Sequence, residues 1–271
     1  MTKELTNIKV FFIDLDGTLL DEKHHEISPT NLQAIHKLQK KANVILSTGR
    51  LGQNLSKYMK LTKVKYAVAG NGSQIVNSEG KVLWSKPIDQ KTVKFVLDFA
   101  KKTGLSFKVD DGKTAYGVKG IISRLICRLL RYKILKHRNF DLRGIYKLVL
   151  WGKNKYKMQR FVKKLKKVLV NASLVTSTRG YTIEITHHQA TKGFGNEFVW
   201  KQLLHINDIK KTVHIGDSMN DSTVIGFVGM MVAMKNSPRD LIKIADYVGP
   251  HYKKGGFAKL INGYKLKRVK K

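Results

Sequence analysis

The sequence predicts an α/β protein with a Rossmann-like, doubly wound parallel-sheet core and an inserted α+β domain. Over the first 70 residues, apolar runs such as 8–14 and 43–47 alternate with helical patterns, as in buried parallel strands. From about residue 87 the strands instead alternate polar and apolar residues, and near residue 188 the first pattern returns. We therefore expect a discontinuous core, residues 1–86 and 188–271, around an inserted domain, residues 87–187.

The first part of the core contains the clearest elements. The run "IKVFFID", residues 8–14, predicts a buried central strand, and "NVILSTGR", 43–50, predicts a second one. Between them a helix is expected to begin with Ser28 as its N-cap and Pro29 at its first position. The segment "YAVAGNGSQIV", 66–76, predicts a third strand that ends in Asn-Gly.

The inserted segment predicts a layer of strands with few helices. Helices are expected over Lys91–Lys102 and 155–169, and strands within 105–118, 145–151, 172–177 and 181–187. The stretch "ISRLICRLLRYKILKH", 122–137, predicts a basic amphipathic helix. Its apolar stripe fits packing against its own sheet better than the alternative, an anionic membrane surface.

The second part of the core again alternates helices and strands. Helices are expected at "TKGFGNEFVWKQLL" (191–204), "DSTVIGFV" (221–228) and "SPRDLIKIA" (237–245). Strands are expected at "KTVHIGDSMND" (211–221), which runs into acids, and "MMVAM" (230–234).

Composition limits the class of protein. The 271 residues are 42% apolar, which is enough for a sizeable core. No apolar run approaches the about 18 residues of a membrane helix, and the first residues lack the apolar stretch of a signal peptide. The single cysteine, Cys127, excludes an internal disulfide and a multi-cysteine metal site. We therefore expect a cytoplasmic protein without a transmembrane segment.

The charge is strongly positive and unevenly distributed. The formal net charge is +33, and residues 112–183 carry 19 Lys and Arg against one acid, Asp141. Such a field favours anionic ligands and leaves nucleic acid open as a partner. The alternative is an ordinary solvated, lysine-rich surface.

Three of the predicted strands end in polar residues that suit phosphate chemistry. Parallel strands present their carboxyl ends at one edge of the sheet, where ligands bind. That edge is expected to gather Asp14, Asp16, Thr18, Thr48, Asp217, Asn220 and Asp221. Four carboxylates in one place repel one another unless a cation lies among them, and oxygen ligands suit Mg²⁺. An Asp can also attack phosphorus, and Lys192, which begins a helix, is suited to hold a phosphate.

These residues carry a family resemblance. "DLDGT" (14–18), "STGR" (47–50), "TKG" (191–193) and "GDSMND" (216–221) resemble, in order and spacing, the four motifs of the haloacid dehalogenase (HAD) superfamily. The chain is most similar to its Cof-type branch, whose members are Mg²⁺-dependent phosphatases with a large α/β cap. The resemblance covers nearly the whole chain, including "VAMKNSP" and "KKGGFAKLI" near the end.

The resemblance implies a role for each matching residue. Asp14 is implied as the nucleophile that becomes an aspartyl phosphate. Asp16 is implied as the acid that protonates the leaving oxygen and then as the base that activates water. Thr48, Lys192 and Asn220 are implied as the residues that bind the phosphoryl group.

The resemblance also implies a Mg²⁺ site. Its residues are Asp14, Asp16 through its backbone carbonyl, Asp217 and Asp221. Asp221 is implied to support the metal through water or to act on Lys192 directly.

The sequence offers weaker candidates for substrate selection. They are Arg50, for which a surface ion pair is the simpler interpretation, and Asp110, Asp111, Arg179 and Tyr181 of the inserted domain. His187 and His188 invite a metal interpretation, but hinge or loop residues fit them better because no Cys or second His cluster accompanies them. Asn71 and Gly72 are expected to shape a loop near the site.

Together these features predict a phosphatase of small phosphorylated metabolites such as sugar phosphates, nucleotides or phosphorylated cofactors. One alternative is a phosphomutase on the same fold, which passes the phosphoryl group to a second hydroxyl instead of water. Another is a basic nucleic-acid-binding protein with an idle phosphatase site, which no nucleic-acid motif in the sequence supports. The sequence leaves the oligomeric state open.

Overall fold

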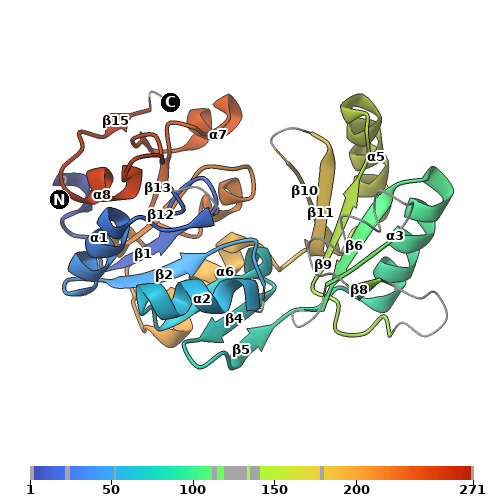
Figure 1. Ribbon diagram of the computed structural model, residues 1–271, viewed down its shortest axis with the longest axis horizontal. Helices are drawn as coiled ribbons and strands as arrows, with labels where there is room; N and C mark the ends of the chain where they lie inside the picture. The colour runs from blue at the N-terminus through green and yellow to red at the C-terminus, as the bar shows by residue number, and fades with distance from the viewer. Residues whose placement is uncertain are drawn as a thin grey trace. The chain divides into compact units, whose positions relative to one another are not determined.

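A computed structural model describes residues 3–21, 25–51, 53–111, 115–118, 133–134, 141–177 and 180–269. The chain forms two compact units (Figure 1). The first, called the core, consists of Met1–Trp84 and Thr191–Lys271, and the second, called the insert, of Ser85–Ala190. Among the described residues, no helix combines the length and the apolar character that crossing a membrane requires.

The core contains a nine-stranded sheet in the order β15-β14-β13-β12-β1-β2-β3-β4-β5. The strands are β1 (Val10–Ile13), β2 (Asn43–Ser47), β3 (Tyr66–Ala69), β4 (Gln74–Asn77), β5 (Val82–Ser85), β12 (Thr212–Gly216), β13 (Met230–Ala233), β14 (Tyr247–Val248) and β15 (Lys267–Arg268). All neighbours from β14 to β3 are parallel, whereas β4 and β15 run antiparallel to β3 and β14. The predicted parallel-sheet core is confirmed.

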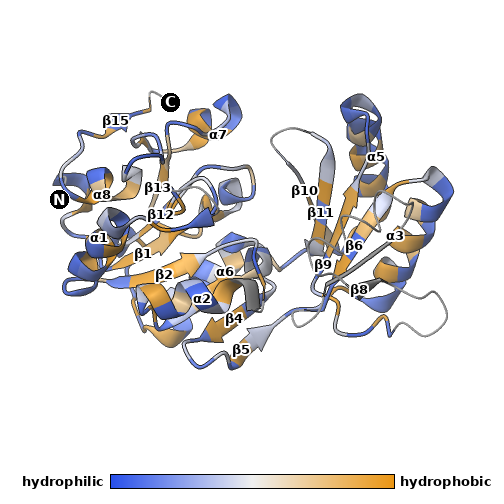
Figure 2. Cartoon of the chain, viewed as in Figure 1, coloured by the Kyte–Doolittle hydropathy of each residue, from blue (hydrophilic) through white to orange (hydrophobic). Residues whose placement is uncertain are grey.

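Helices cover this sheet because its central strands are apolar on both faces. They are α1 (Pro29–Gln39), α2 (Gln53–Thr62), α6 (Lys192–Phe198), α7 (Arg239–Ile244) and α8 (Gly256–Ile261). Val10 and Phe12 of β1 pack in one cluster with Trp200 and Leu241. The alternate residues of β1 point to the opposite face and are equally buried. Figure 2 shows the hydrophobic colour concentrated on the strands.

The topology places two loops side by side at the centre of the sheet. From β1 the chain moves outward through β2 and β3, and it later returns on the other side of β1 through β12 and β13. Ile13 of β1 lies beside Ile215 of β12. The residues that follow these two strands therefore emerge together at the switch point, where open α/β sheets bind ligands.

The insert is a six-stranded sheet in the order β10-β11-β9-β6-β7-β8, covered by helices on one face. Its elements are α3 (Gln90–Thr103), β6 (Ser106–Asp110), β7 (Ala115–Val118), β8 (Lys133–Ile134), β9 (Lys147–Trp151), α5 (Lys155–Val168), β10 (Ala172–Thr176) and β11 (Thr182–His187). Phe107, Leu148 and Ile183 pack with Val96 of α3 and Leu165 of α5. The alternate strand residues face away from the helices, as expected for an α+β layer.

Two predicted helices differ from the structure. The segment 221–228 forms only a short 3₁₀ turn, η6 (Asp221–Val224). Gly226 lies at φ +84°, outside the helical region, so a helix cannot continue through it. The basic helix predicted over 122–137 does not include Lys133 and Ile134, which form β8 beside β7. The rest of that stretch, with Cys127, lies outside the described residues.

Candidate active site

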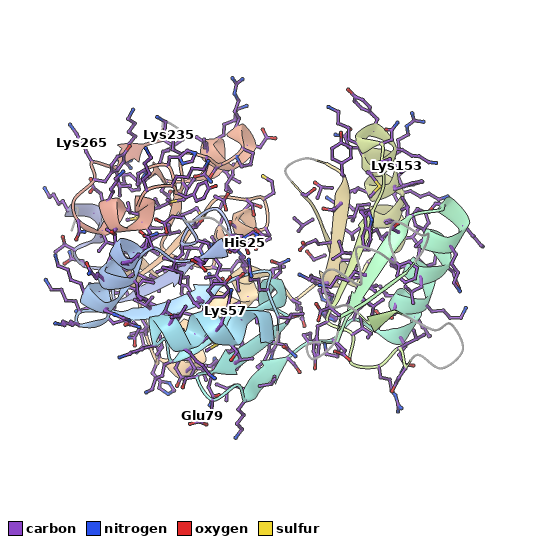
Figure 3. All side chains as sticks on the ribbon, in the orientation of Figure 1. His25, Lys57, Glu79, Lys153, Lys235 and Lys265 are labelled. Atoms are coloured by element: carbon purple, nitrogen blue, oxygen red, sulfur yellow. The ribbon has the colours of Figure 1, made fainter. Side chains whose placement is uncertain are left out.

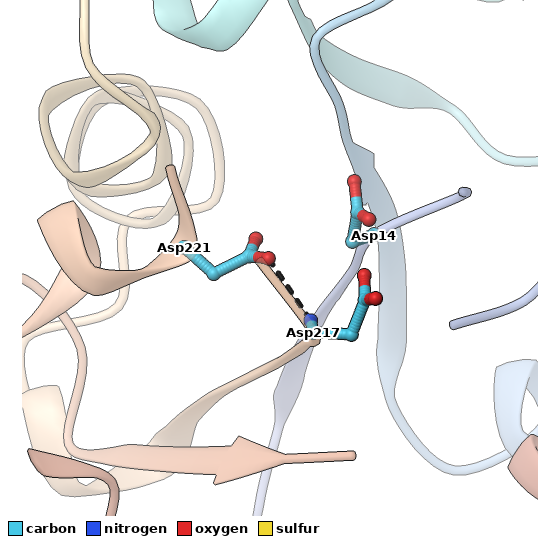
Figure 4. Close-up of side chains that lie close together, drawn as sticks. All are labelled: Asp14, Asp217 and Asp221. Carbon is cyan, nitrogen blue, oxygen red and sulfur yellow. Dashed lines mark hydrogen bonds between the residues drawn. The ribbon is translucent and has the colours of Figure 1, made fainter. Parts of the chain in front are cut away.

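Three carboxylates meet at the carboxyl ends of β1 and β12. Asp14 follows β1 directly, Asp217 follows β12, and Asp221 begins η6. One oxygen from each side chain lies within 4.8 Å of the others (Figure 4). Among the described residues, no other group of three or more His, Cys, Asp or Glu side chains has such geometry.

Lys192 is a cation buried among these acids. Its side chain is fully buried at the start of α6, where Thr191 caps the helix by accepting a hydrogen bond from the Phe194 amide. Nζ donates to Oδ1 of Asp14 at 2.7 Å and to Oδ1 of Asp221 at 2.6 Å. Burial alone would lower the pKa of Lys192, but the two carboxylates outweigh it and raise this pKa. The lysine is therefore held as a cation.

Asp221 is surrounded by donors from the protein. Its Oδ1 accepts hydrogen bonds from Lys192 and from Nε2 of His214, the latter at 2.8 Å. Its Oδ2 accepts from the backbone amides of Asp217 and Ser218 at 3.0 and 2.9 Å. Burial would raise the pKa of Asp221, yet Lys192 and His214 hold it well below its usual value. Four donors match the acceptor capacity of a carboxylate, so Asp221 is committed to this network.

Asp217 is held against the loop that follows β1. Gly17 has φ +80°, and a Cβ there would lie 2.3 Å from Oδ2 of Asp217, so only glycine permits the approach. Asn236 bridges the loop and the carboxylate, because its Nδ2 donates to the Gly17 carbonyl and to Oδ2 of Asp217, each at 2.9 Å. Thr18 donates a long hydrogen bond of 3.5 Å to Oδ1 of Asp217.

The site has the electrostatic character of a cation site. Burial raises the pKa of Asp14 well above its usual value, and repulsion from Asp221 and Asp217 adds to it against the attraction of Lys192. Burial and the charge of Asp221 likewise raise the pKa of Asp217 to about 7. Fully ionised, Asp14, Asp217 and Asp221 would carry more negative charge than Lys192 alone balances. Their hard oxygen atoms fit a divalent cation such as Mg²⁺.

Asp16 is engaged by Arg50. Nε and Nη2 of Arg50 donate to the two oxygens of Asp16 at 2.7 and 2.6 Å, and Nη1 donates to the Tyr58 hydroxyl at 3.2 Å. His25 Nδ1 lies 3.2 Å from Asp16 Oδ1. Burial would raise the pKa of Asp16, but Arg50 outweighs it and lowers this pKa. The ion pair expected for Arg50 is thus present and partly exposed, and its partner is Asp16.

Two of the phosphate-binding candidates, Thr48 and Asn220, follow the strands on either side of β1. Thr48 is buried after β2, and its Oγ1 accepts a hydrogen bond from the Arg50 amide at 3.2 Å. Asn220 Nδ2 donates to Oδ1 of Asn71 at 2.8 Å, which ties the loop after β12 to the loop after β3. In that second loop, a Cβ on Gly72 would lie 2.0 Å from the Thr191 carbonyl. Thr191 directly precedes Lys192, so these loops converge on one site.

The candidates in the insert are spread over its own elements. Asp110 is 8% exposed and pairs with Lys108 at 3.2 Å, whereas Tyr181 is 43% exposed. Arg179 lies outside the described residues. The rings of His187 and His188 lie 4.3 Å apart and belong to no metal-ligating group among the described residues.

Sequence reasoning missed two residues that organise the site. Asn236 was visible only as part of "VAMKNSP", with no role attached. His214 is fully buried in β12, and a polar residue inside the apolar run "TVHIG" was the signal that it needed partners.

Comparisons with known proteins agree with this geometry. Residues 11–261 match the model of the haloacid dehalogenase-like hydrolases. The phosphatase YwpJ of Bacillus subtilis is 26% identical over 89% of this chain and 94% of that protein. The HMP-PP phosphatase of Shigella boydii is 24% identical over 83% of this chain and 86% of that protein.

A solved structure shows the same fold. The sugar phosphatase BT4131, of HAD subclass IIB, has a TM-score of 0.80 at 19% identity, with 94% of this chain and 98% of that chain covered. These findings confirm the resemblance that the four motifs carry.

Proposed function

The chain belongs to the haloacid dehalogenase-like hydrolases, and we propose that it is a Mg²⁺-dependent phosphatase that acts through an aspartyl phosphate on Asp14. The observation that best supports this proposal is the position of Lys192. A fully buried cation touches both Asp14 and Asp221 beside Asp217, at the edge of the sheet where a phosphate would bind. A carboxylate suited to attack phosphorus, a cation suited to bind phosphate and a group of acids suited to hold a metal thus lie together.

The metal ligands would be Asp14, Asp217 and the backbone carbonyl of Asp16. Bound Mg²⁺ would screen the negative charge of the phosphate from the attacking carboxylate. Asp221 would act on Lys192 instead, because its two oxygens already accept four hydrogen bonds.

The proposed reaction has two steps. An oxygen of Asp14 attacks phosphorus, the ester P–O bond breaks, and Asp16 in its acid form protonates the leaving oxygen. Asp16 then removes a proton from water, and the water oxygen attacks phosphorus. The bond between phosphorus and the Asp14 oxygen breaks, which releases inorganic phosphate and restores the Asp14 carboxylate. Lys192, Thr48 and Asn220 would hold the phosphoryl oxygens in both steps.

Arg50 favours one protonation state of Asp16, whereas the two steps require different ones. Its two hydrogen bonds lower the pKa of Asp16 and favour the carboxylate, which is the form required for activating water. The first step requires the acid form. We infer that the contact between Arg50 and Asp16 loosens when substrate binds.

Asp16→Asn is expected to separate the steps. p-Nitrophenolate leaves without protonation, so the variant should still transfer phosphate to Asp14, but no base would then activate water. Rapid mixing with p-nitrophenyl phosphate should show a burst of about one equivalent of nitrophenolate and then a steady rate reduced by about 10²–10⁴-fold. Acid quenching should trap labelled phosphate on the protein. A variant that loses the burst and the steady rate together would argue against this assignment.

Mg²⁺ is expected to stabilise the protein more at high pH than at low pH. The pKa of Asp217 is about 7 in the folded protein, whereas its ordinary value is about 3.8. Between these two pH values the folded protein without metal therefore holds a proton on Asp217 that the unfolded chain has lost. Its stability should fall as pH rises from about 4 to 7 and then level off.

The measurement is the melting temperature with Mg²⁺ and with EDTA between pH 5 and pH 8.5. The difference in melting temperature between the Mg²⁺ and EDTA samples should increase toward pH 8, because the metal takes the place of the proton on the carboxylates. Asp217→Asn should remove most of this difference. Equal melting temperatures with Mg²⁺ and EDTA at pH 8 would contradict the metal site.

The substrates proposed are small phosphorylated metabolites. Relatives act on HMP-PP and on sugar phosphates by name, and the insert carries much of the positive charge. We propose that the insert is a cap that selects substrates. If the charge of the cap selects substrates, bisphosphorylated sugars should show a higher, more salt-dependent kcat/KM than monophosphorylated ones.

The proposed function is tested by a panel of phosphorylated metabolites assayed for released phosphate with Mg²⁺ or EDTA. An isomerised sugar phosphate in place of free phosphate would indicate a phosphomutase. A gel shift with RNA or DNA at physiological salt, combined with no turnover on the panel, would favour the nucleic-acid-binding alternative.

A further inference from the structure

A line of hydrogen-bonded side chains runs from the proposed catalytic centre into the interior of the core. It contains Lys192, Asp221, His214, Asn196 and Ser47, each 0% exposed. They come from four separate places: the end of β2, helix α6, strand β12 and the turn η6. Five fully buried polar residues need partners, and here they satisfy one another.

The contacts are continuous. Lys192 Nζ and His214 Nε2 both contact Oδ1 of Asp221, at 2.6 and 2.8 Å. On the other side of the imidazole, Nδ1 lies 3.1 Å from Nδ2 of Asn196. Oδ1 of Asn196 accepts a hydrogen bond of 2.8 Å from the Ser47 hydroxyl.

The chemistry of these groups gives every hydrogen bond a direction. The Asp221 carboxylate only accepts, so Nε2 of His214 must carry a proton. The Asn196 amide nitrogen only donates, so Nδ1 must be the bare nitrogen. In this orientation the amide oxygen accepts from the Ser47 hydroxyl, so both ends of the Asn196 amide have a suitable partner. The imidazole therefore has one defined tautomer, with its N–H aimed at Asp221.

We propose that His214 and Asn196 are positioning residues of the phosphatase site: they orient the Asp221 carboxylate, which in turn places the Lys192 ammonium for phosphoryl binding. This inference rests on the function proposed above. No contact with substrate or metal is assigned to either residue.

The arrangement matters because a lysine ammonium has only three N–H groups. Two of them point to Asp14 and Asp221, which leaves the third for an oxygen of the transferring phosphoryl group. Without the hydrogen bond from His214, the Asp221 carboxylate can rotate, and the Lys192 ammonium that it binds then moves with it. Removing such a supporting hydrogen bond typically costs about 10–100-fold in activity.

The test compares two amide substitutions of His214 that differ by one methylene. In His214→Gln the side-chain amide reaches the place of Nε2 and can still donate to Asp221. In His214→Asn the amide reaches only the place of Nδ1, so the contact with Asn196 is kept and the one with Asp221 is lost. We expect His214→Gln to retain kcat within a few-fold and His214→Asn to lose about 10–100-fold.

The loss should lie in kcat, and the inhibition constant of vanadate, a mimic of the transferring phosphoryl group, should rise in parallel. Melting curves establish that both variants are folded at the assay temperature. Equal activity of the two folded variants, or equal loss in both, would overturn the proposal, because the donor at Nε2 would then be irrelevant.

A second measurement does not depend on turnover. Nitrogen-15 NMR of the His214 ring in the wild-type protein at neutral pH reports which nitrogen carries the proton. The proposal requires Nε2–H, and an Nδ1–H tautomer would overturn it. Absence of phosphatase activity in the wild-type protein would instead refute the proposed function and leave the NMR result to decide whether the network is built as described.

Discussion

Asp14→Asn is expected to abolish Mg²⁺-dependent phosphate release while leaving the protein folded. The amide has no negatively charged oxygen to attack phosphorus, and it is a weaker metal ligand than a carboxylate. We expect turnover of p-nitrophenyl phosphate to fall by at least about 10³-fold. The fold should persist, because the amide oxygen can still accept the hydrogen bond from Lys192, and Asp221 still neutralises that lysine.

A suitable control is Asp21→Asn, which alters a buried acid outside the site. The carboxylate of Asp21 accepts hydrogen bonds from the amides of Ser28 and Gly255 and from the Ser28 hydroxyl, at 2.7–2.9 Å. This variant should melt at a lower temperature and keep its kcat, the reverse of Asp14→Asn. Near-wild-type turnover by folded Asp14→Asn would remove Asp14 from the role of nucleophile.

Lys192→Met is expected to have the largest effect on stability. The change leaves Asp14 and Asp221 buried without their common cation, and breaking a buried ion pair in this way costs about 3–5 kcal/mol of unfolding free energy. The loss should be smaller at pH 5 than at pH 8, because a protonated carboxyl no longer repels its neighbour. Turnover should fall by about 10²–10³-fold as the phosphoryl group loses its charged partner.

The matched control is Lys201→Met, which removes a half-exposed lysine near the end of the same helical segment. Lys201 pairs with Glu197 on the surface, and its Nζ lies 5.1 Å from the centre of the Trp200 ring, so its loss should change stability by less than about 1 kcal/mol. Denaturation is best followed in a Trp151→Phe background. The remaining tryptophans, Trp84 and Trp200, then report on the core alone. Similar losses for both lysine variants would show that burial of the Lys192 ion pairs contributes little.

The positions of most strands and helices were predictable because local patterns determine them. Apolar runs such as "VFFI", rich in β-branched and aromatic residues, favour a buried strand. The N-cap predicted at Ser28 is present, with its hydroxyl accepting from the Asn31 amide. The prediction failed where a single backbone angle decided the outcome. The helix expected from Asp221 stops as a short turn before Gly226, whose positive φ is not marked by the hydrophobic pattern.

The surface charge was likewise readable from composition. Lysines such as Lys57, Lys153, Lys235 and Lys265 are exposed (Figure 3), as the hydrophilic composition of their segments suggests. What this charge contacts does not follow from composition, so the predicted preference for bisphosphorylated substrates depends on measurement.

The identities of the motif residues came from the sequence alone, since four short motifs in one order specify carboxylates, a hydroxyl and a lysine. Which of these groups touch was decided by the tertiary structure. Asp16 is paired with Arg50 rather than standing free, and Asp221 accepts four donors, including His214, which no motif contains. Hydrogen bonds between residues far apart in the sequence form only where the strand order and the loop conformations bring those residues together. Only the assembled sheet brings β1, β2 and β12 together and thereby determines those contacts.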